Sequence, residues 1–122
     1  MGDSVQPLFD AGLVQLVEPD HVLSPEVRLL PSPGHTPGHV SVAIESRGQR
    51  AVITGDMMHH PCQIARPELL ARFDSDHEAA LATRRRLLAE WADQPVLVVG
   101  THFVVPAGGF IRSDVDGYRF EN

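Results

Sequence analysis

Short runs of apolar residues, separated by proline- and glycine-rich turns, predict a chain built largely of strands. From Val40 to Glu45 apolar and polar residues nearly alternate, and a second run returns over residues 50–54 after a turn at 46–49, which predicts a β-hairpin. The turn pair Asp116-Gly117 predicts another hairpin. The other predicted strands cover residues 14–17, 27–30, 96–99, 110–112 and 118–120.

Two segments show the spacing of an amphipathic helix, in which apolar residues recur every three to four positions. The longer one runs from residue 75 to about residue 92, and Ser75 and Glu78 have the spacing of a capping box at its start. Trp91 lies on its apolar face and is interpreted as a core anchor against the sheet. The shorter helix is predicted within residues 3–13.

Together these elements predict an α/β (α+β) fold with six or seven strands and two helices, forming a single domain over residues 1–122. An apolar fraction of 43% is enough to form a core. Ten glycines and ten prolines agree with the many turns. The sequence contains no repeat, linker or low-complexity segment that would mark a boundary between domains.

The charge balance disfavours two classes of partner. The net charge is −6 and the pI is near 5.5, whereas binding to nucleic acid or to an anionic membrane requires a basic face. The basic run Arg84–Arg86 lies within the long helix and is interpreted as its solvated face. No apolar run approaches the ~20 residues of a membrane span. Cys62 is the single cysteine, which fits a reducing compartment, and a cytoplasmic location is expected.

Three predicted strands are each followed by a residue that can bind a metal ion. The loop at residues 31–39, which contains three prolines and two glycines, carries His35 and His39. Asp56 and His102 follow two later apolar runs at similar positions. Imidazole and carboxylate are the usual nitrogen and oxygen ligands of a catalytic zinc ion. The alternative interpretation of the first loop is an ordinary proline–glycine turn with two surface histidines.

Two further histidines follow Asp56 closely. His59 and His60 lie in the loop-rich segment 57–67. Either they form a pocket wall beside Asp56, where one of them touches the substrate, or they belong to a surface loop. The residue types alone support both interpretations equally.

The order and spacing of these motifs resemble the C-terminal half of the metallo-β-lactamase superfamily of metallo-hydrolases. The segments 55–61 and 73–76 make the resemblance closest to the lactonase and methyl-parathion-hydrolase-like branch. The resemblance implies a fold that is one αβ half of the family's αββα sandwich. It also implies a set of metal ligands, namely His35, Asp56 and His102.

The same resemblance implies a metal-dependent hydrolase. Zinc is the expected metal, with two divalent ions in the complete fold and manganese or iron as alternatives. Asp56 would bridge the two ions and is the expected catalytic residue, while His39 would support the site without being a ligand. Metal-bound hydroxide would attack a small ester-like substrate, which is an ester, a lactone or a phosphotriester. His59 and His60 are the candidates to contact that substrate.

One family signature is absent from this chain. The pattern His-x-His-x-Asp-His should precede His35, but the seven histidines stand at positions 21, 35, 39, 59, 60, 77 and 102. The family fold has two similar halves, and 122 residues correspond to about one of them. We therefore expect an incomplete chain with weak or no activity alone, whose apolar sheet face is covered in a homodimer or by the missing N-terminal half. The alternative is a non-catalytic half-domain that self-associates or complements a partner.

Overall fold

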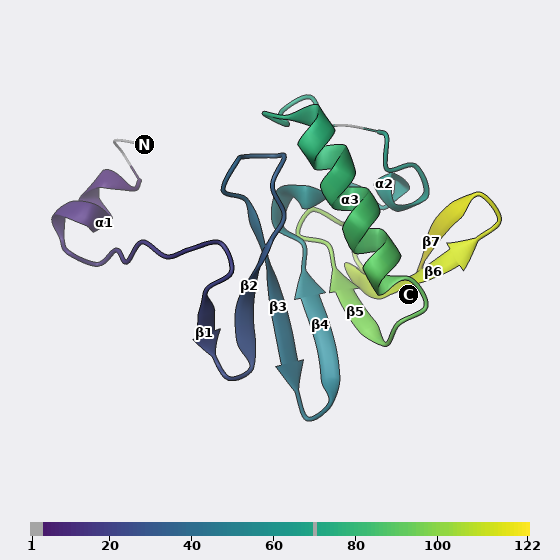
Figure 1. The fold of residues 1–122 in the computed structure, drawn as a ribbon, viewed down its shortest axis with the longest axis horizontal. Helices are drawn as coiled ribbons and strands as arrows, with labels where there is room; N and C mark the ends of the chain where they lie inside the picture. Colours follow the sequence, from purple (N-terminus) through teal and green to yellow (C-terminus); the bar gives the residue numbers. More distant parts are fainter. Residues whose placement is uncertain (1–3, 70) are drawn as a thin grey trace.

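The computed structural model describes residues 4–69 and 71–122 and shows a seven-stranded sheet with a long helix packed on it (Figure 1). The strands follow chain order across the sheet, and the predicted α/β fold is confirmed. The strands are β1 (Val22–Ser24), β2 (Val27–Pro31), β3 (Val40–Ser46), β4 (Gln49–Ile53), β5 (Val96–Val99), β6 (Gly108–Asp114) and β7 (Gly117–Glu121). The helices are α1 (Gln6–Asp10), α2 (Cys62–Ala65) and α3 (His77–Trp91), with a 3-10 turn η1 (Gly55–Met57).

The directions of the strands bring three loops to one edge of the sheet. β2 and β3 are antiparallel, and so are β3 and β4, which means that β2 and β4 run in the same direction. β4 and β5 pair in parallel, an arrangement that needs a crossover connection, and α3 lies within that connection. The segments that follow β2, β4 and β5 therefore leave the sheet at the same edge. These segments carry the predicted metal ligands His35, Asp56 and His102.

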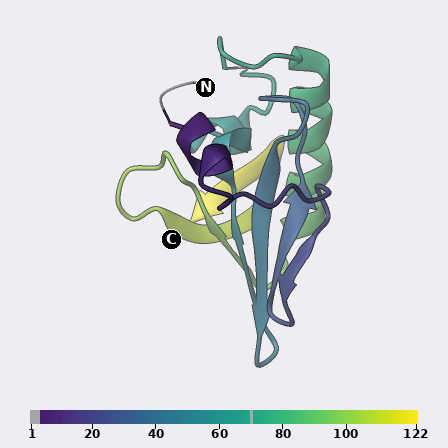
Figure 2. The ribbon, with the colours of Figure 1, turned by 90° about the vertical axis from the view of Figure 1, so that its left-hand side faces the viewer.

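α3 covers one face of the sheet (Figure 2), and the hydrophobic core lies between the helix and this face. In β5, Val96 and Val98 are buried at 3% and 0% exposure, while Leu97 between them points to the opposite face and is 38% exposed. Trp91 is 3% exposed and packs in this core, as predicted. The core also contains Val52, Met57, Met58, Ile64, Leu87, Leu88, Phe103 and Ile111.

The face of the sheet opposite α3 is apolar as well. Successive residues of a strand point to opposite faces, so the neighbours of Val52 and Val98 in β4 and β5 lie on this second face. Ile53 and Leu97 are 37% and 38% exposed there. Cross-strand pairing aligns one row of Leu29, Val42, Ile53 and Val99 and a second row of Val27, Ile44, Ala51 and Leu97. We call these two rows the open sheet face.

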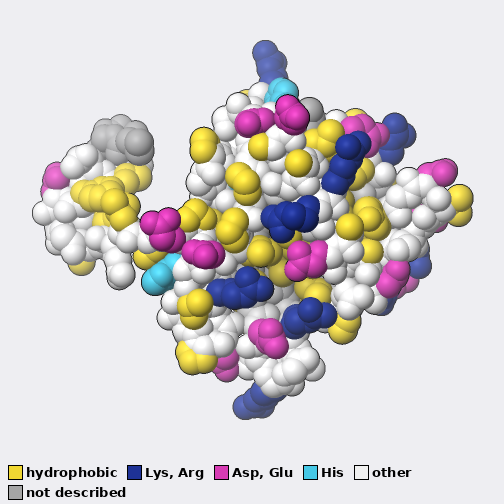
Figure 3. Space-filling view, in the orientation of Figure 1, with side chains coloured by type: hydrophobic (Ala, Val, Ile, Leu, Met, Phe, Trp, Pro, Cys, Tyr) yellow, Lys and Arg dark blue, Asp and Glu magenta, His cyan; other side chains and the backbone are white. Residues whose placement is uncertain are grey.

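The side of the molecule that carries α3, away from the open sheet face, has charged side chains of both signs. Figure 3 shows basic and acidic side chains interspersed among apolar ones on this side. Within residues 4–69 and 71–122, no helix combines the length and the hydropathy that a bilayer crossing requires.

The predicted strand at residues 14–17 is wrong. The segment belongs to no strand, and Leu16 within it is 81% exposed. A strand needs a hydrogen-bonded neighbour, and the first pair along the chain is β1 with β2. The predicted helix at residues 3–13 is shorter than expected, because α1 covers Gln6–Asp10, and residue 3 lies outside the described residues.

Two predictions on the long helix are also wrong. The N-cap of α3 is Asp76, whose carboxylate accepts a hydrogen bond of 2.9 Å from the N–H of Ala79. Ser75 instead donates its hydroxyl to the carbonyl of Gly34 at 3.2 Å, so it ties the loop before β3 to the start of the helix. Arg84 does not lie on a solvated face, because its side chain is 0% exposed.

Candidate metal centre

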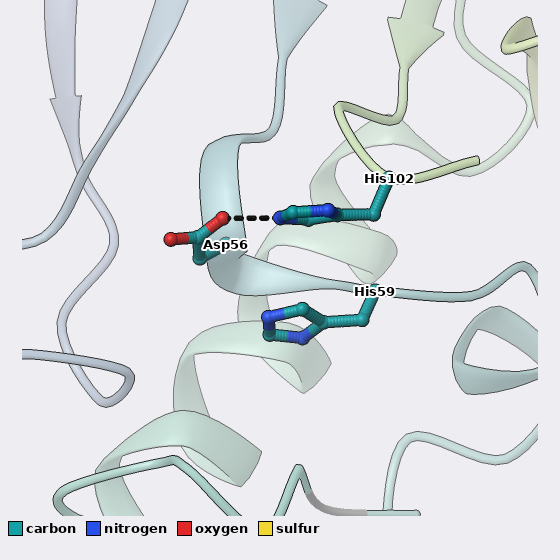
Figure 4. Close-up of side chains that lie close together, drawn as sticks. All are labelled: Asp56, His59 and His102. Atoms are coloured by element: carbon teal, nitrogen blue, oxygen red, sulfur yellow. Dashed lines mark hydrogen bonds and ion pairs between the residues drawn. The ribbon is translucent and has the colours of Figure 1, made fainter.

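Three loops at one edge of the sheet converge on the carboxylate of Asp56, and Figure 4 shows it beside His102. Oδ1 of Asp56 lies 2.6 Å from Nε2 of His102, and Oδ2 lies 3.5 Å from Nε2 of His35. The three predicted ligands are therefore brought together, with the carboxylate between the two imidazoles. The side chains of Asp56 and His102 are 42% and 45% exposed, so the site is open to solvent.

His59 joins this group from the turn that follows η1. Its ring stacks on that of His102, with 4.8 Å between the centroids and 22° between the planes (Figure 4). The centroid of the His35 ring lies 5.3 Å from that of the His59 ring. One ligand atom from each of Asp56, His59 and His102 can be chosen so that all lie within 4.8 Å of one another. His59 therefore lies beside Asp56 and His102.

His39 lies behind the group and holds the backbone of Asp56. Its Nε2 accepts a hydrogen bond of 2.9 Å from the N–H of Asp56. Its Nδ1 lies 3.0 Å from the carbonyl oxygen of Ser32 and 2.9 Å from the Ser32 hydroxyl. A ring whose Nε2 accepts carries its proton on Nδ1, so His39 donates towards Ser32. Both ring nitrogens are used, and the placement agrees with a supporting role.

The backbone around Asp56 depends on a glycine. Gly55 has φ +59°, a left-handed conformation that side-chain-bearing residues rarely adopt. A Cβ atom at this position would lie 2.8 Å from Nε2 of His39. The glycine therefore allows both the turn that places Asp56 and the close approach of His39.

The imidazoles around Asp56 favour its ionised form. The hydrogen bond with His102 lowers the pKa of Asp56 below its usual value, and the positive charge that His35 carries when it is protonated adds to this effect; together they outweigh the opposing effect of burial. Burial lowers the pKa of His59 and of His39. Neutral imidazoles keep a nitrogen lone pair, which a metal ligand needs.

The donor set fits a divalent metal of the kind used in hydrolysis. It combines a carboxylate that favours its charged form with imidazole nitrogens, the ligand types that bind zinc at catalytic sites. A catalytic zinc usually takes three protein ligands and keeps another position open, which agrees with the exposure of Asp56 and His102. His60 points elsewhere: it is exposed, and its Nδ1 accepts from the N–H of Cys62 at the start of α2.

Sequence reasoning missed two residues behind His35. Oδ1 of Asp74 lies 3.2 Å from Nδ1 of His35, and Oδ2 lies 3.0 Å from Nη2 of Arg84. The side chains of Asp74 and Arg84 are both 0% exposed. Asp74 lies in the segment 73–76 that carries the family resemblance, but nothing in the sequence marks its carboxylate as buried. Nothing in the run Arg84–Arg86 distinguishes its first member.

The chain is similar to a known family and to several solved structures. A family model for the metallo-beta-lactamase superfamily matches residues 4–102. No curated protein sequence matches the chain. The crystal structure of the hydrolase AbOPH, in the beta lactamase superfamily, superposes with a TM-score of 0.86 over 97% of this chain and 41% of its own, at 24% identity.

Two lactone-cleaving proteins have similar folds. AidC, a dizinc quorum-quenching lactonase seen with a product, matches with a TM-score of 0.83 at 22% identity, over 96% of this chain and 41% of its own. An N-acyl homoserine lactone hydrolase, with N-hexanoyl-L-homoserine bound at its catalytic metal centre, matches with a TM-score of 0.60 at 26% identity, over 74% and 36%. The chain spans 41% or less of each of these three structures. Because the family model covers most of its residues, the chain belongs to the metallo-beta-lactamase superfamily.

Proposed function

We propose that this chain is part of a metal-dependent hydrolase that cleaves a small ester-like substrate, which is an ester, a lactone or a phosphotriester. The residues that would hold the metal are His35, Asp56 and His102, and Asp56 would be the catalytic residue because its carboxylate would be shared between the ions. The observation that carries the proposal is the carboxylate of Asp56, which places one oxygen near Nε2 of each of the other two residues. Zinc is the proposed metal, with manganese or iron as alternatives.

The chain's own residues contribute in different ways. Bound divalent ions would lower the pKa of a water molecule and stabilise negative charge on the substrate oxygen. Asp56 would hold these ions with its two oxygens, while the hydrogen bond from its N–H to His39 fixes its backbone. His59 stacks beside His102 and would contact the substrate at the open side of the site. His60, which is turned towards α2, is the weaker candidate for such a contact.

We also propose that the chain alone is a poor catalyst and that a partner covers its open sheet face. The chain offers His35, Asp56 and His102 as proposed ligands and lacks the His-x-His-x-Asp-His signature, so we propose weak or no turnover by the chain alone. The open sheet face would be covered by a second copy of the chain or by the portion of the hydrolase fold that this sequence does not span. A mass in solution of twice the chain mass would support the second copy. The single free cysteine, Cys62, supports a proposed cytoplasmic location.

The test of the metal centre is elemental analysis of the purified chain, alone and after Asp56→Ala. We expect near-stoichiometric zinc, manganese or iron in the original chain. The variant should lose the metal, because it lacks the carboxylate that lies between the imidazoles of His35 and His102. Asp20→Ala is the matched control, since Asp20 lies in an exposed turn, and it should keep the metal. A folded chain that binds none of the three metals when they are supplied would refute the proposed ligand set.

A second function is favoured by the open sheet face. In this alternative the chain is a non-catalytic half-domain that self-associates or complements a partner, and its ligands are inherited but unused. The apolar rows of that face support it, because a second copy or a partner would remove them from water. A metal-free folded dimer, without hydrolysis of esters, lactones or phosphotriesters after metal loading, would support this alternative.

A further inference from the structure

Arg84 is a buried charge that needs an explanation. Its side chain is 0% exposed, although it lies on α3 next to two exposed arginines. A buried guanidinium is unfavourable unless its N–H groups are paired. Among the described residues, its side chain bonds to η1 and to the segment before α3: Nε donates to the carbonyl of Met57 (2.8 Å), Nη1 to those of Pro67 (3.3 Å) and Leu69 (3.2 Å), and Nη2 to Asp74 (3.0 Å).

Two of these contacts lead directly to proposed metal ligands. Met57 is the residue after Asp56, so the bond from Nε holds the backbone next to that carboxylate. Asp74 uses its other oxygen, Oδ1, to contact Nδ1 of His35 at 3.2 Å. The guanidinium group of Arg84 therefore connects Met57, next to Asp56, with Asp74, which contacts His35.

The contact between Asp74 and His35 determines which nitrogen of the imidazole is free. Oδ2 of Asp74 already accepts from Arg84 and from the N–H of Ala71 at 3.1 Å. Oδ1 is left to accept the Nδ1 proton of His35, which places the lone pair of that ring on Nε2. Nε2 faces Oδ2 of Asp56 at 3.5 Å. Two electron-rich atoms that face each other at this distance favour a cation between them.

The backbone of the same segment holds the loop of His35. The N–H of Ser75 donates to the carbonyl of His35 at 3.1 Å, and the N–H of Asp76 donates to that of Gly34 at 3.0 Å. A Cβ atom on Gly34 would lie 2.3 Å from Cα of Ala80 in α3, so the loop packs directly on the helix. The segment from Asp74 to the first turn of α3 therefore acts as a template for the His35 loop.

We propose that Asp74 and Arg84 form a buried positioning pair that fixes the tautomer of His35 and the separation between His35 and Asp56. This inference rests on the proposed function for its meaning, because it concerns the ligands of that site. Neither residue touches the substrate or the metal position. Lysine cannot replace Arg84, since its three donors radiate from one point and cannot reach both Met57 and Asp74 in the geometry of the planar fork.

The first test reads the tautomer in the metal-free protein. In the Asp74→Asn variant, the amide keeps the size of the carboxylate, but it can satisfy Arg84 with its oxygen and must then present N–H groups to His35. We expect nitrogen-15 NMR at a pH well above the ordinary pKa of histidine to show protonated Nδ1 in His35 of the original chain and protonated Nε2 in the variant. An unchanged His35 tautomer would overturn the proposal.

The second test measures zinc affinity by competition with a coloured chelator. We expect Asp74→Asn and Arg84→Lys each to weaken zinc binding roughly 10- to 100-fold, the usual effect of removing a group that orients a ligand. Arg85→Lys is the matched control, because Arg85 is the exposed neighbour on the same helix, and its affinity should stay within about twofold of the original. Equal affinities of all the variants would refute the positioning role.

These two tests separate the inference from the function beneath it. If the original chain binds no zinc, the proposed function fails while the tautomer measurement still decides whether Asp74 orients His35. If zinc binds and the tautomer does not change, the function stands and the inference fails. Arg84→Lys keeps a positive charge in the helix, and circular dichroism checks that each variant folds. If the Arg84→Lys chain is unfolded, the tautomer and the zinc affinity of Asp74→Asn decide whether the proposal holds.

Discussion

We predict that Gly55→Ala destabilises the protein and disturbs the metal centre, and that Gly48→Ala does much less. The two glycines make a matched pair, because both have positive φ values, +59° and +76°, in turns next to β4. They differ in their surroundings. A Cβ atom on Gly48 would meet nothing within 4 Å, whereas one on Gly55 would lie 2.8 Å from Nε2 of His39 and 3.3 Å from the carbonyl oxygen of Val40.

The expected magnitudes follow from two separate effects. A residue with a Cβ atom in the left-handed region costs roughly 1–2 kcal/mol, and this applies to both variants. In Gly55→Ala the ring of His39 must also move, which breaks its 2.9 Å hydrogen bond to the N–H of Asp56. Loss of such a bond costs about 0.5–1.5 kcal/mol. The free energy of unfolding should therefore fall by about 1–2 kcal/mol in Gly48→Ala and by about 1.5–3.5 kcal/mol in Gly55→Ala.

Urea unfolding followed by circular dichroism measures the two changes, provided that the slopes against urea agree. Zinc affinity and the nitrogen-15 shifts of His39 give independent readouts of the metal centre, and Gly48→Ala should leave both unchanged. Equal losses of stability in the two variants, with an unchanged His39 signal, would refute the reasoning that His39 and Gly55 are in close contact.

Two further predictions test other parts of the molecule. Burial lowers the pKa of His59, so the histidine is protonated in the unfolded chain at a higher pH than in the folded chain. The free energy of unfolding should therefore decrease as the pH falls below about 6.5. His59→Gln should reduce this decrease, whereas His77→Gln, at an exposed position in α3, should not. Urea midpoints measured at several pH values check this prediction. If the midpoint of His59→Gln fell with decreasing pH as steeply as that of the original chain, the prediction would be wrong. If a second copy covers the open sheet face, Ile53→Glu should reduce the mass in solution to that of one chain, and Val115→Glu, 94% exposed, should not. An Ile53→Glu chain that remains dimeric would exclude this face as the interface.

The parts of the fold that depend on local chemistry were predictable from the sequence. The hairpin of β3 and β4 follows from alternation around a turn, and its observed bounds, Val40–Ser46 and Gln49–Ile53, agree closely with the prediction. The grouping of His35, Asp56 and His102 was implied by the family resemblance, and the structure explains it, because each residue follows one of three strands that run in the same direction. The position of His59 was not predictable, since a turn of two histidines gives no indication of which ring faces inward.

Arg84 shows why the remaining features required the structure. Three successive arginines on a helix indicate a solvated face, and this interpretation holds for Arg85 and Arg86, which are exposed. The acceptors that bury Arg84 are mostly backbone carbonyls, and the one with the shortest hydrogen bond, that of Met57 at 2.8 Å, lies 27 residues away along the chain. A carbonyl oxygen is present at every position, so no residue type marks it as an acceptor. The burial of this charge is therefore a consequence of the fold that brings η1 and the segment before α3 together, and it can be inferred only after that fold is known.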